Sequence, residues 1–167
     1  MSTNALDFSI NINGVEYTNK FIEDIKIDKT DINKDFCEQH EKFAYYSTLH
    51  ELAKDQELRL KKVMEDTYGQ VDHEKRVEAA AMSEKNSKFK LTEKMCENEV
   101  KLNARYQRAL LDYLDAKKLA GVLGVARESF NQRKEMLISL GANLRCGAFE
   151  LTSLKDNAKN VINKNKE

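Results

Sequence analysis

Hydrophobic residues recur at helical intervals over two long stretches that together make up most of the chain. In the second stretch, residues 105–145, the apolar positions lie three, four or seven residues apart, and no proline interrupts them. These positions are Ala116, Leu119, Leu123, Ala126, Phe130, Leu137 and Leu140. Asn103 is expected to cap the start of this helix and Gly141 to end it, because their residue types favour those places. A helix of about forty residues spans roughly 60 Å, so it needs a partner of similar length.

The first stretch, from about residue 34 to residue 84, keeps a three–four alternation that predicts a coiled-coil seam. The seam positions are Tyr46, Leu49, Ala53, Gln56, Leu60, Val63, Thr67, Gln70, Glu74, Val77 and Ala81. The seam loses its apolar character after Tyr68. Gly69 is expected to mark a kink or a loosening there, because glycine costs about 1 kcal/mol relative to alanine inside a helix.

A turn and a short helix are predicted between the two long helices. Residues 86–90 have the composition of a reversing turn, and Thr92 can cap a helix over residues 93–100. A second joint follows at residues 101–103. The predicted fold is mostly α, a long antiparallel helical hairpin or coiled coil with a short connector helix.

The N-terminal residues 7–17 have a different pattern. Phe8, Ile10 and Ile12 alternate with polar residues, and an Asn13-Gly14 pair precedes Val15 and Tyr17. Asn-Gly favours the positive φ values of a type I′ turn, so the pattern predicts a small β-hairpin. The alternative is a disordered arm, because an isolated two-stranded hairpin is marginally stable in water.

Residues 18–35 are acidic and irregular, and their isoleucines (Ile22, Ile25, Ile27 and Ile32) are spaced for an extended strip over a helix. Asp31, Asn33 and Asp35 superficially resemble a calcium loop, but the sixth position is not glycine and the twelfth is not glutamate. A cap provided by Asp31 or Asn33 for the following helix is the preferred interpretation. The predicted organisation is an arm or hairpin over 1–19, a helical core over 20–145, and a tail over 146–167 that forms at most a short helix.

Charge and cysteine content narrow the functional classes. A third of the residues are charged, yet the net charge is zero, so a polyanion could be bound only by a local basic patch. Cys37, Cys96 and Cys146 lie far apart without a CxxC pair, which indicates reduced thiols rather than a zinc or redox motif. The sequence has neither a signal-peptide pattern nor an apolar run long enough to span a bilayer. We therefore expect a soluble protein of the cytoplasm.

No catalytic motif is present, whether a phosphate-binding glycine loop, a metalloprotease helix or a nucleophile elbow. His40 and His50 are ten residues apart, about 100° out of phase on a helix, so they do not form a metal site. The expectation is a protein that binds rather than catalyses, without a metal or cofactor.

Basic residues gather around the predicted turn between the long helices. The candidate DNA-binding residues are Arg59, Lys61, Lys62, Lys85, Lys88, Lys90, Arg105 and Arg108. In a hairpin these groups are expected to converge on one pole, with Phe89 or Tyr68 available to stack on bases. Cations on phosphates and aromatic rings on bases are typical of single-stranded nucleic-acid binding. The alternative is the ordinary charged surface of a coiled coil.

Three stretches, residues 22–53, 90–118 and 130–145, together resemble the phage UvsY-type recombination mediator family. The last of them, FNQRKEMLISLGANLR, is the most specific part of the resemblance. The resemblance implies a small α-helical protein that forms ring-like homo-oligomers and binds single-stranded DNA. Its implied partners are the phage recombinase and single-strand-binding protein, and its implied place is the host cytoplasm.

The resemblance also implies roles for particular residues. Basic residues ahead of a glycine-containing turn bind DNA in that family, and Arg59, Lys61 and Lys62 ahead of Gly69 are the nearest match, although the spacing differs. The family's C-terminal segment contributes to oligomerisation. The corresponding apolar residues are Phe130, Met136, Leu137, Ile138, Leu140 and Leu144. A structural, adaptor or scaffold coiled coil without DNA binding is the competing hypothesis.

Overall fold

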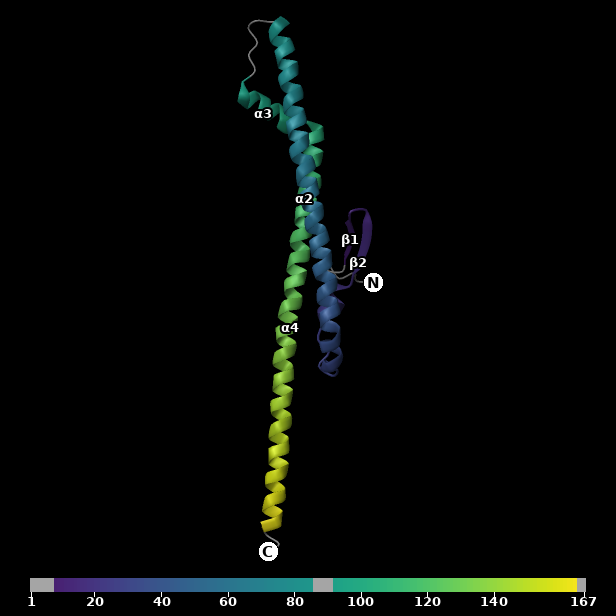
Figure 1. The fold of residues 1–167 in the computed structure, drawn as a ribbon, viewed down its shortest axis with the longest axis vertical. Helices are drawn as coiled ribbons and strands as arrows, with labels where there is room; N and C mark the ends of the chain where they lie inside the picture. Colours follow the sequence, from purple (N-terminus) through teal and green to yellow (C-terminus); the bar gives the residue numbers. More distant parts are fainter. Residues whose placement is uncertain (1–7, 86–91, 165–167) are drawn as a thin grey trace. The chain divides into compact units, whose positions relative to one another are not determined.

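The computed structural model describes residues 8–85 and 92–164, with side chains for residues 9–84 and 92–147. Two strands, β1 (Phe8–Ile12) and β2 (Val15–Asn19), precede four helices (Figure 1). These are α1 (Phe21–Ile25), α2 (Ile32–Lys85), α3 (Glu93–Leu102) and α4 (Ala104–Lys164). The mostly α fold with a small N-terminal β-hairpin is therefore confirmed.

Polar caps set the helix boundaries. Asp31 Oδ1 accepts a hydrogen bond from the Lys34 amide at 3.1 Å, and Thr92 Oγ1 accepts one from the Met95 amide at 3.3 Å. Asn103 Oδ1 accepts one from the Arg105 amide at 2.9 Å. Each bond satisfies a backbone N–H that the first turn of a helix leaves free. All three predicted caps are confirmed.

The chain forms two compact units. The first contains Lys20–Tyr45 and α4 from Ala126 onward, and the second contains Ser9–Asn19 and Tyr46–Val125. In each unit α2 packs antiparallel on α4: residues later in α2 contact residues earlier in α4.

The second unit carries the β-hairpin and the connector helix. Asn13 and Gly14 have φ values of 52° and 84°, as a type I′ turn requires, and Ile10 and Ile12 are buried. Tyr68 on α2 and Tyr106 on α4 pack edge to face, with ring centroids 5.5 Å apart. The Cys96 thiol on α3 donates to Asp72 on α2 at 3.2 Å, and Arg76 bridges Asp72 and Glu93. These contacts hold α3 against α2.

The first unit is built around a buried arginine. Arg133 on α4 donates to Gln39 Oε1 at 2.6 Å, to the Lys26 carbonyl at 3.0 Å and to the carboxylate of Asp35. Gln39 Nε2 in turn donates to the Phe130 carbonyl at 2.8 Å, and Phe21 of α1 packs edge to face on the Phe130 ring. The network thus joins α2 and α4 to the segment that precedes α2. That segment is one helical turn followed by irregular chain, rather than the extended strip expected.

Two expectations about the long helices are wrong. Gly141 does not end α4, which continues to Lys164. A Cβ at Gly141 would lie 3.2 Å from the Phe36 ring, so the glycine allows close packing instead. Gly69 lies within the continuous helix α2, and a Cβ there would meet nothing within 4 Å.

The second wrong expectation concerns the seam of α2. Tyr46, Leu49 and Ala53 are buried as expected, but Val63 and Val77 are exposed, and Val71 is buried in their place. A straight helix has 3.6 residues per turn, so its inward face drifts by about 20° per heptad from a strict seven-residue repeat. By contrast, every position of the α4 stripe is buried or half-buried, as expected.

Candidate nucleic-acid interface

Five of the eight candidate DNA-binding residues have described side chains, and all five lie in the second unit. Arg59, Lys61 and Lys62 are exposed on α2, and Arg105 and Arg108 are exposed on α4. For Lys85 only the helical backbone is described, and Lys88 and Lys90 lie outside the described residues, as do the predicted turn 86–90 and Phe89.

The candidates whose positions are described do not converge on one pole. Because α2 is helical through Lys85, Lys62 and Lys85 lie about 35 Å apart along its axis. Arg105 forms an ion pair with Glu74 of α2, which places Arg105 between these two groups. Tyr106 packs on Tyr68, so Arg108, half a turn further along α4, lies closer to the level of Lys62. The described basic residues are therefore spread along α2 and α4 rather than gathered at one end.

Acidic neighbours neutralise some of these basic residues. Arg59 pairs with Asp55 at 2.8 Å, Lys61 approaches Glu65 at 3.8 Å, and Arg105 pairs with Glu74. Exposed pairs of this kind contribute at most about 1 kcal/mol, so DNA phosphate could displace the carboxylates. Lys62 and Arg108 form no ion pair with any residue whose side chain is described, which leaves their charges available to a phosphate.

The aromatic candidates differ in availability. Tyr68 packs against Tyr106, and burial, with a smaller effect of Glu97 and Asp72, raises the pKa of its phenol. Its ring is thus part of the contact between α2 and α4. Tyr113 and Lys117 of α4 form a further pair that was not predicted. The Lys117 ammonium lies 5.8 Å from the centroid of the Tyr113 ring. Their spacing of one helical turn could have revealed them.

Asp72, Arg76, Glu93 and Cys96 form a cluster of hydrogen-bonded and charged side chains between α2 and α3. The hydrogen bond from Arg76 and then that from the Cys96 thiol lower the pKa of Asp72, while pairing with Glu93 and Asp72 raises the pKa of Arg76. Burial raises the pKa of Cys96, which keeps the thiol protonated and unreactive. Across the described residues, no group of three or more His, Cys, Asp or Glu side chains could hold a metal ion.

The candidate assembly residues fall into two groups within the first unit. Phe130 and Leu137 are fully buried, and Phe130 packs on Phe21 of α1, so a second copy does not meet them on the surface. Met136, Ile138 and Leu144 are exposed, and Leu140 is half-buried.

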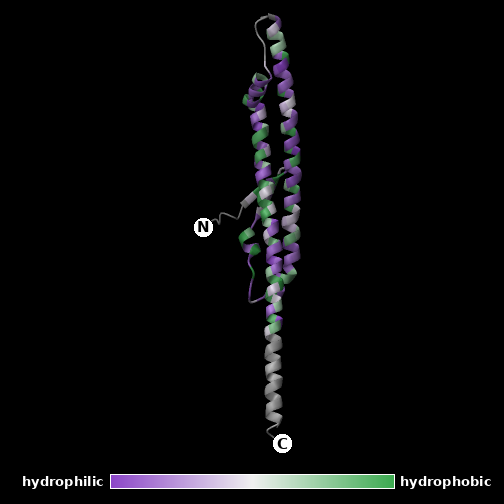
Figure 2. Ribbon diagram, turned by 90° about the vertical axis from the view of Figure 1, so that its left-hand side faces the viewer, coloured by the Kyte–Doolittle hydropathy of each residue, from purple (hydrophilic) through white to green (hydrophobic). Residues whose placement is uncertain are grey.

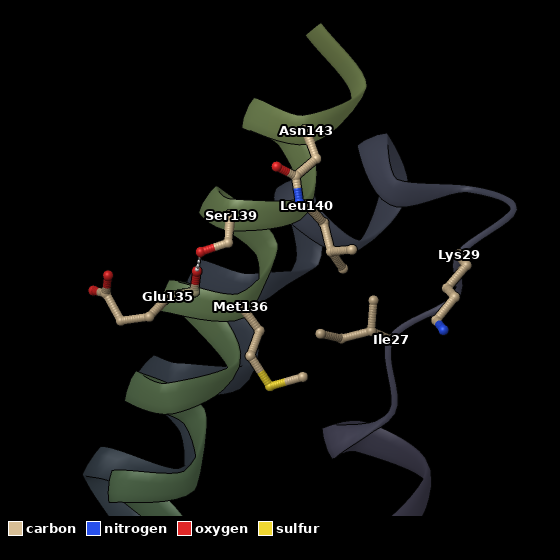
Figure 3. A pocket seen from close by; sticks show the side chains of 7 residues that line it. All are labelled: Ile27, Lys29, Glu135, Met136, Ser139, Leu140 and Asn143. Carbon is tan, nitrogen blue, oxygen red and sulfur yellow. Dashed lines mark hydrogen bonds between the residues drawn. The ribbon is translucent and has the colours of Figure 1, made fainter. Parts of the chain in front are cut away.

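Met136 and Leu140 line a groove of about 450 Å³ (Figure 3). Ile27 forms its opposite wall, with Lys29 above it. Glu135, Ser139 and Asn143 complete the lining, and the Ser139 hydroxyl donates to the Glu135 carbonyl at 3.0 Å. The groove is therefore apolar at its floor and polar at its rim.

Comparison with known proteins gives no relative: no family model, curated protein or solved structure matches the chain. None of the helices in the described part of the chain is long and apolar enough to cross a membrane.

Proposed function

We propose that this protein is a single-stranded DNA-binding recombination mediator of the UvsY type, which assembles as a homo-oligomer and helps load a phage recombinase onto DNA. The resemblance of residues 22–53, 90–118 and 130–145 to that family motivates the proposal. The observation that carries it is the pair of exposed cations Lys62 and Arg108, which lie on adjacent helices and form no ion pair with described side chains. The proposed partners are single-stranded DNA, the recombinase and the phage single-strand-binding protein.

The proposed mechanism is binding without chemistry. Lysine and arginine side chains hold phosphates and release condensed counterions, which supplies most of the affinity. Cations that are spread along α2 and α4 can contact successive phosphates of an extended strand. Repetition of a modest site around an oligomer raises the overall affinity by avidity. The exposed Met136, Ile138 and Leu144 are the proposed assembly contacts, together with Leu140.

Fluorescence anisotropy with a labelled oligonucleotide, measured over a range of salt concentrations, tests the proposal. Affinity should fall steeply with salt, with a slope of log K on log salt of about −0.7 for each phosphate neutralised. Lys61→Glu with Lys62→Glu should weaken binding at least tenfold without changing the oligomer. The matched control reverses Lys34 and Lys134, two exposed lysines of the first unit, which gives the same net charge away from the candidate residues.

A structural or adaptor coiled coil is the second candidate function. The i,i+4 ion pairs, such as Arg59 with Asp55 and Lys101 with Glu97, favour it, because such pairs are typical of a solvated helix surface. Equal loss of binding in both double variants would mean that only net charge matters. An affinity that does not change with salt would contradict DNA binding by this surface and leave the adaptor function.

A further inference from the structure

Within the second unit, the buried face of α4 is mainly alanine, with Leu123, and large apolar residues also lie on its solvent face. The buried face against α2 carries Ala109, Ala116, Ala120 and Leu123. On the opposite face Leu111, Leu114, Val122 and Val125 are exposed by 61, 46, 43 and 69%. Hydropathy along the ribbon shows apolar residues recurring through this part of α4 (Figure 2). A helix that packed only within this hairpin would have its large apolar residues on the face toward α2 and polar residues on the opposite face.

The exposed residues form one straight stripe, which we call the outer seam: Leu111, Leu114, Asp115, Lys118, Val122 and Val125. The spacing of a helix–helix seam, three or four residues from one position to the next, relates Leu111, Leu114, Lys118, Val122 and Val125. Asp115 lies beside Leu114. The stripe extends for about 21 Å along α4. Gly121 lies beside it, and a Cβ there would meet nothing within 4 Å, so another helix could approach the backbone closely. Aligned exposed apolar residues of this kind mark an interaction surface rather than scattered surface hydrophobes.

Charge complementarity identifies the partner as a second copy of this chain. A two-fold axis at the level of Ala116 and Lys117 lies midway between Leu111 and Val122, and also midway between Asp115 and Lys118. Two α4 helices that pair antiparallel about this axis therefore place Leu111 against Val122 of the other copy, and Asp115 against its Lys118. Each of these contacts occurs twice, because an isologous interface repeats every contact.

We propose that the outer seam of α4 is a self-association surface, on which two copies pair antiparallel through Leu111, Val122, Asp115 and Lys118. It is separate from the proposed assembly contacts of the first unit, and it does not depend on DNA binding. Other pairings fit less well. A parallel pair would oppose Lys118 to Lys118 and Asp115 to Asp115, and a partner of different sequence would have no reason to share the axis.

Disulfide trapping tests the register. Leu111→Cys and Val122→Cys are made in separate preparations of the full chain, with exposed Cys37 and Cys146 replaced by serine. The two positions are about 16 Å apart along one helix, so they cannot join within a chain. The mixed preparations should give a disulfide-linked dimer under mild oxidation, and each preparation alone should give little. Dimers from Leu111→Cys alone would indicate parallel pairing and overturn the proposal.

Charge exchange tests the partner. Asp115→Lys and Lys118→Asp should each weaken self-association about tenfold, because each opposes like charges twice. Mixing these two variants should restore association as a heterodimer, and so should combining both changes in one chain. Circular dichroism and thermal unfolding of each variant show whether α4 remains folded. Failure of the mixture to associate better than either variant alone would overturn the proposal, whatever other contacts the seam makes.

Discussion

Arg133 of α4 forms a salt bridge with Asp35 of α2 in which both side chains are nearly excluded from solvent, with exposures of 1 and 8%. Gln39 and the Lys26 carbonyl accept further hydrogen bonds from the guanidinium, and the Asp28 amide donates to the same aspartate. Burying two charges costs several kcal/mol each, which is offset only when all their hydrogen-bonding groups are satisfied. Only one register of α2 on α4 in this unit satisfies them, so the pair fixes that register.

Removing one partner of this pair should destabilise the protein strongly. Arg133→Met leaves the Asp35 carboxylate buried without its cation, and we expect a loss of about 3–5 kcal/mol in the free energy of unfolding. The double variant Asp35→Leu with Arg133→Met buries no charge and should recover at least half of that loss. Urea unfolding of the two single variants and the double variant gives the coupling energy. Additive losses would mean that the two side chains do not act as a pair.

The sequence predicted elements of this fold from local patterns. Alternation and Asn13-Gly14 predicted the β-hairpin, a threonine three residues before Met95 predicted the start of α3, and the stripe from Ala116 to Leu140 predicted the inward face of α4. Each of these signals lies within a few residues of the structure it specifies, so no knowledge of the partner segment was needed.

Contacts between distant segments could not be predicted in this way. Arg133 lies on the α4 stripe between Phe130 and Leu137, but its partner Asp35 is almost a hundred residues away. The pairing of Arg105 with Glu74 likewise depends on the register of two helices. The expected convergence was wrong for the described basic residues because Lys62 and Lys85 lie far apart on the same helix, a separation that the predicted helix over residues 34–84 already implied.

Two glycines in the middle of α4, Gly121 and Gly124, have different surroundings. A Cβ at Gly124 would lie 3.2 Å from Nε2 of His50, whereas one at Gly121 would meet nothing within 4 Å. Gly124 therefore allows the imidazole of α2 to pack closely on α4. Neither residue breaks the helix.

Alanine substitution should separate a helix effect from a packing effect. Gly69→Ala adds a methyl group in open space and should stabilise the protein by up to about 1 kcal/mol through helix propensity. Gly124→Ala gains the same propensity but must displace the His50 ring, so its net effect should be clearly smaller or unfavourable. Thermal unfolding of both variants makes the comparison. Combining Gly124→Ala with His50→Ala should relieve the clash; equal stabilisation by the two single variants would argue against the close contact.

The three cysteines should differ in reactivity. Cys37 and Cys146 are exposed, whereas Cys96 is buried, donates to Asp72 and has a pKa raised by burial. Thiolate is the reactive form, so iodoacetamide at pH 8 should modify Cys37 and Cys146 first. Peptide mass spectrometry with time gives the three rates, and a urea-denatured sample provides the intrinsic rates. Asp72→Ala should accelerate the modification of Cys96, and equally rapid modification of all three thiols in the native protein would contradict the packing of α3 on α2.

Acid should weaken the attachment of α3 to α2 through Asp72. Arg76 and Cys96 hold the pKa of this carboxyl below its ordinary value of 3.8. A carboxyl with a lowered pKa in the folded state contributes its stabilisation fully above the unfolded value, and loses it as the pH falls through the folded value. Stability should therefore decline below about pH 4 as Asp72 becomes protonated. Asp72→Asn should be less stable than the natural protein at pH 7 and should lose less stability on going to pH 3. Asp66→Asn, an exposed change on the same helix, is the matched control, and an identical pH dependence of the Asp72 and Asp66 variants would contradict this role of the Arg76 pair.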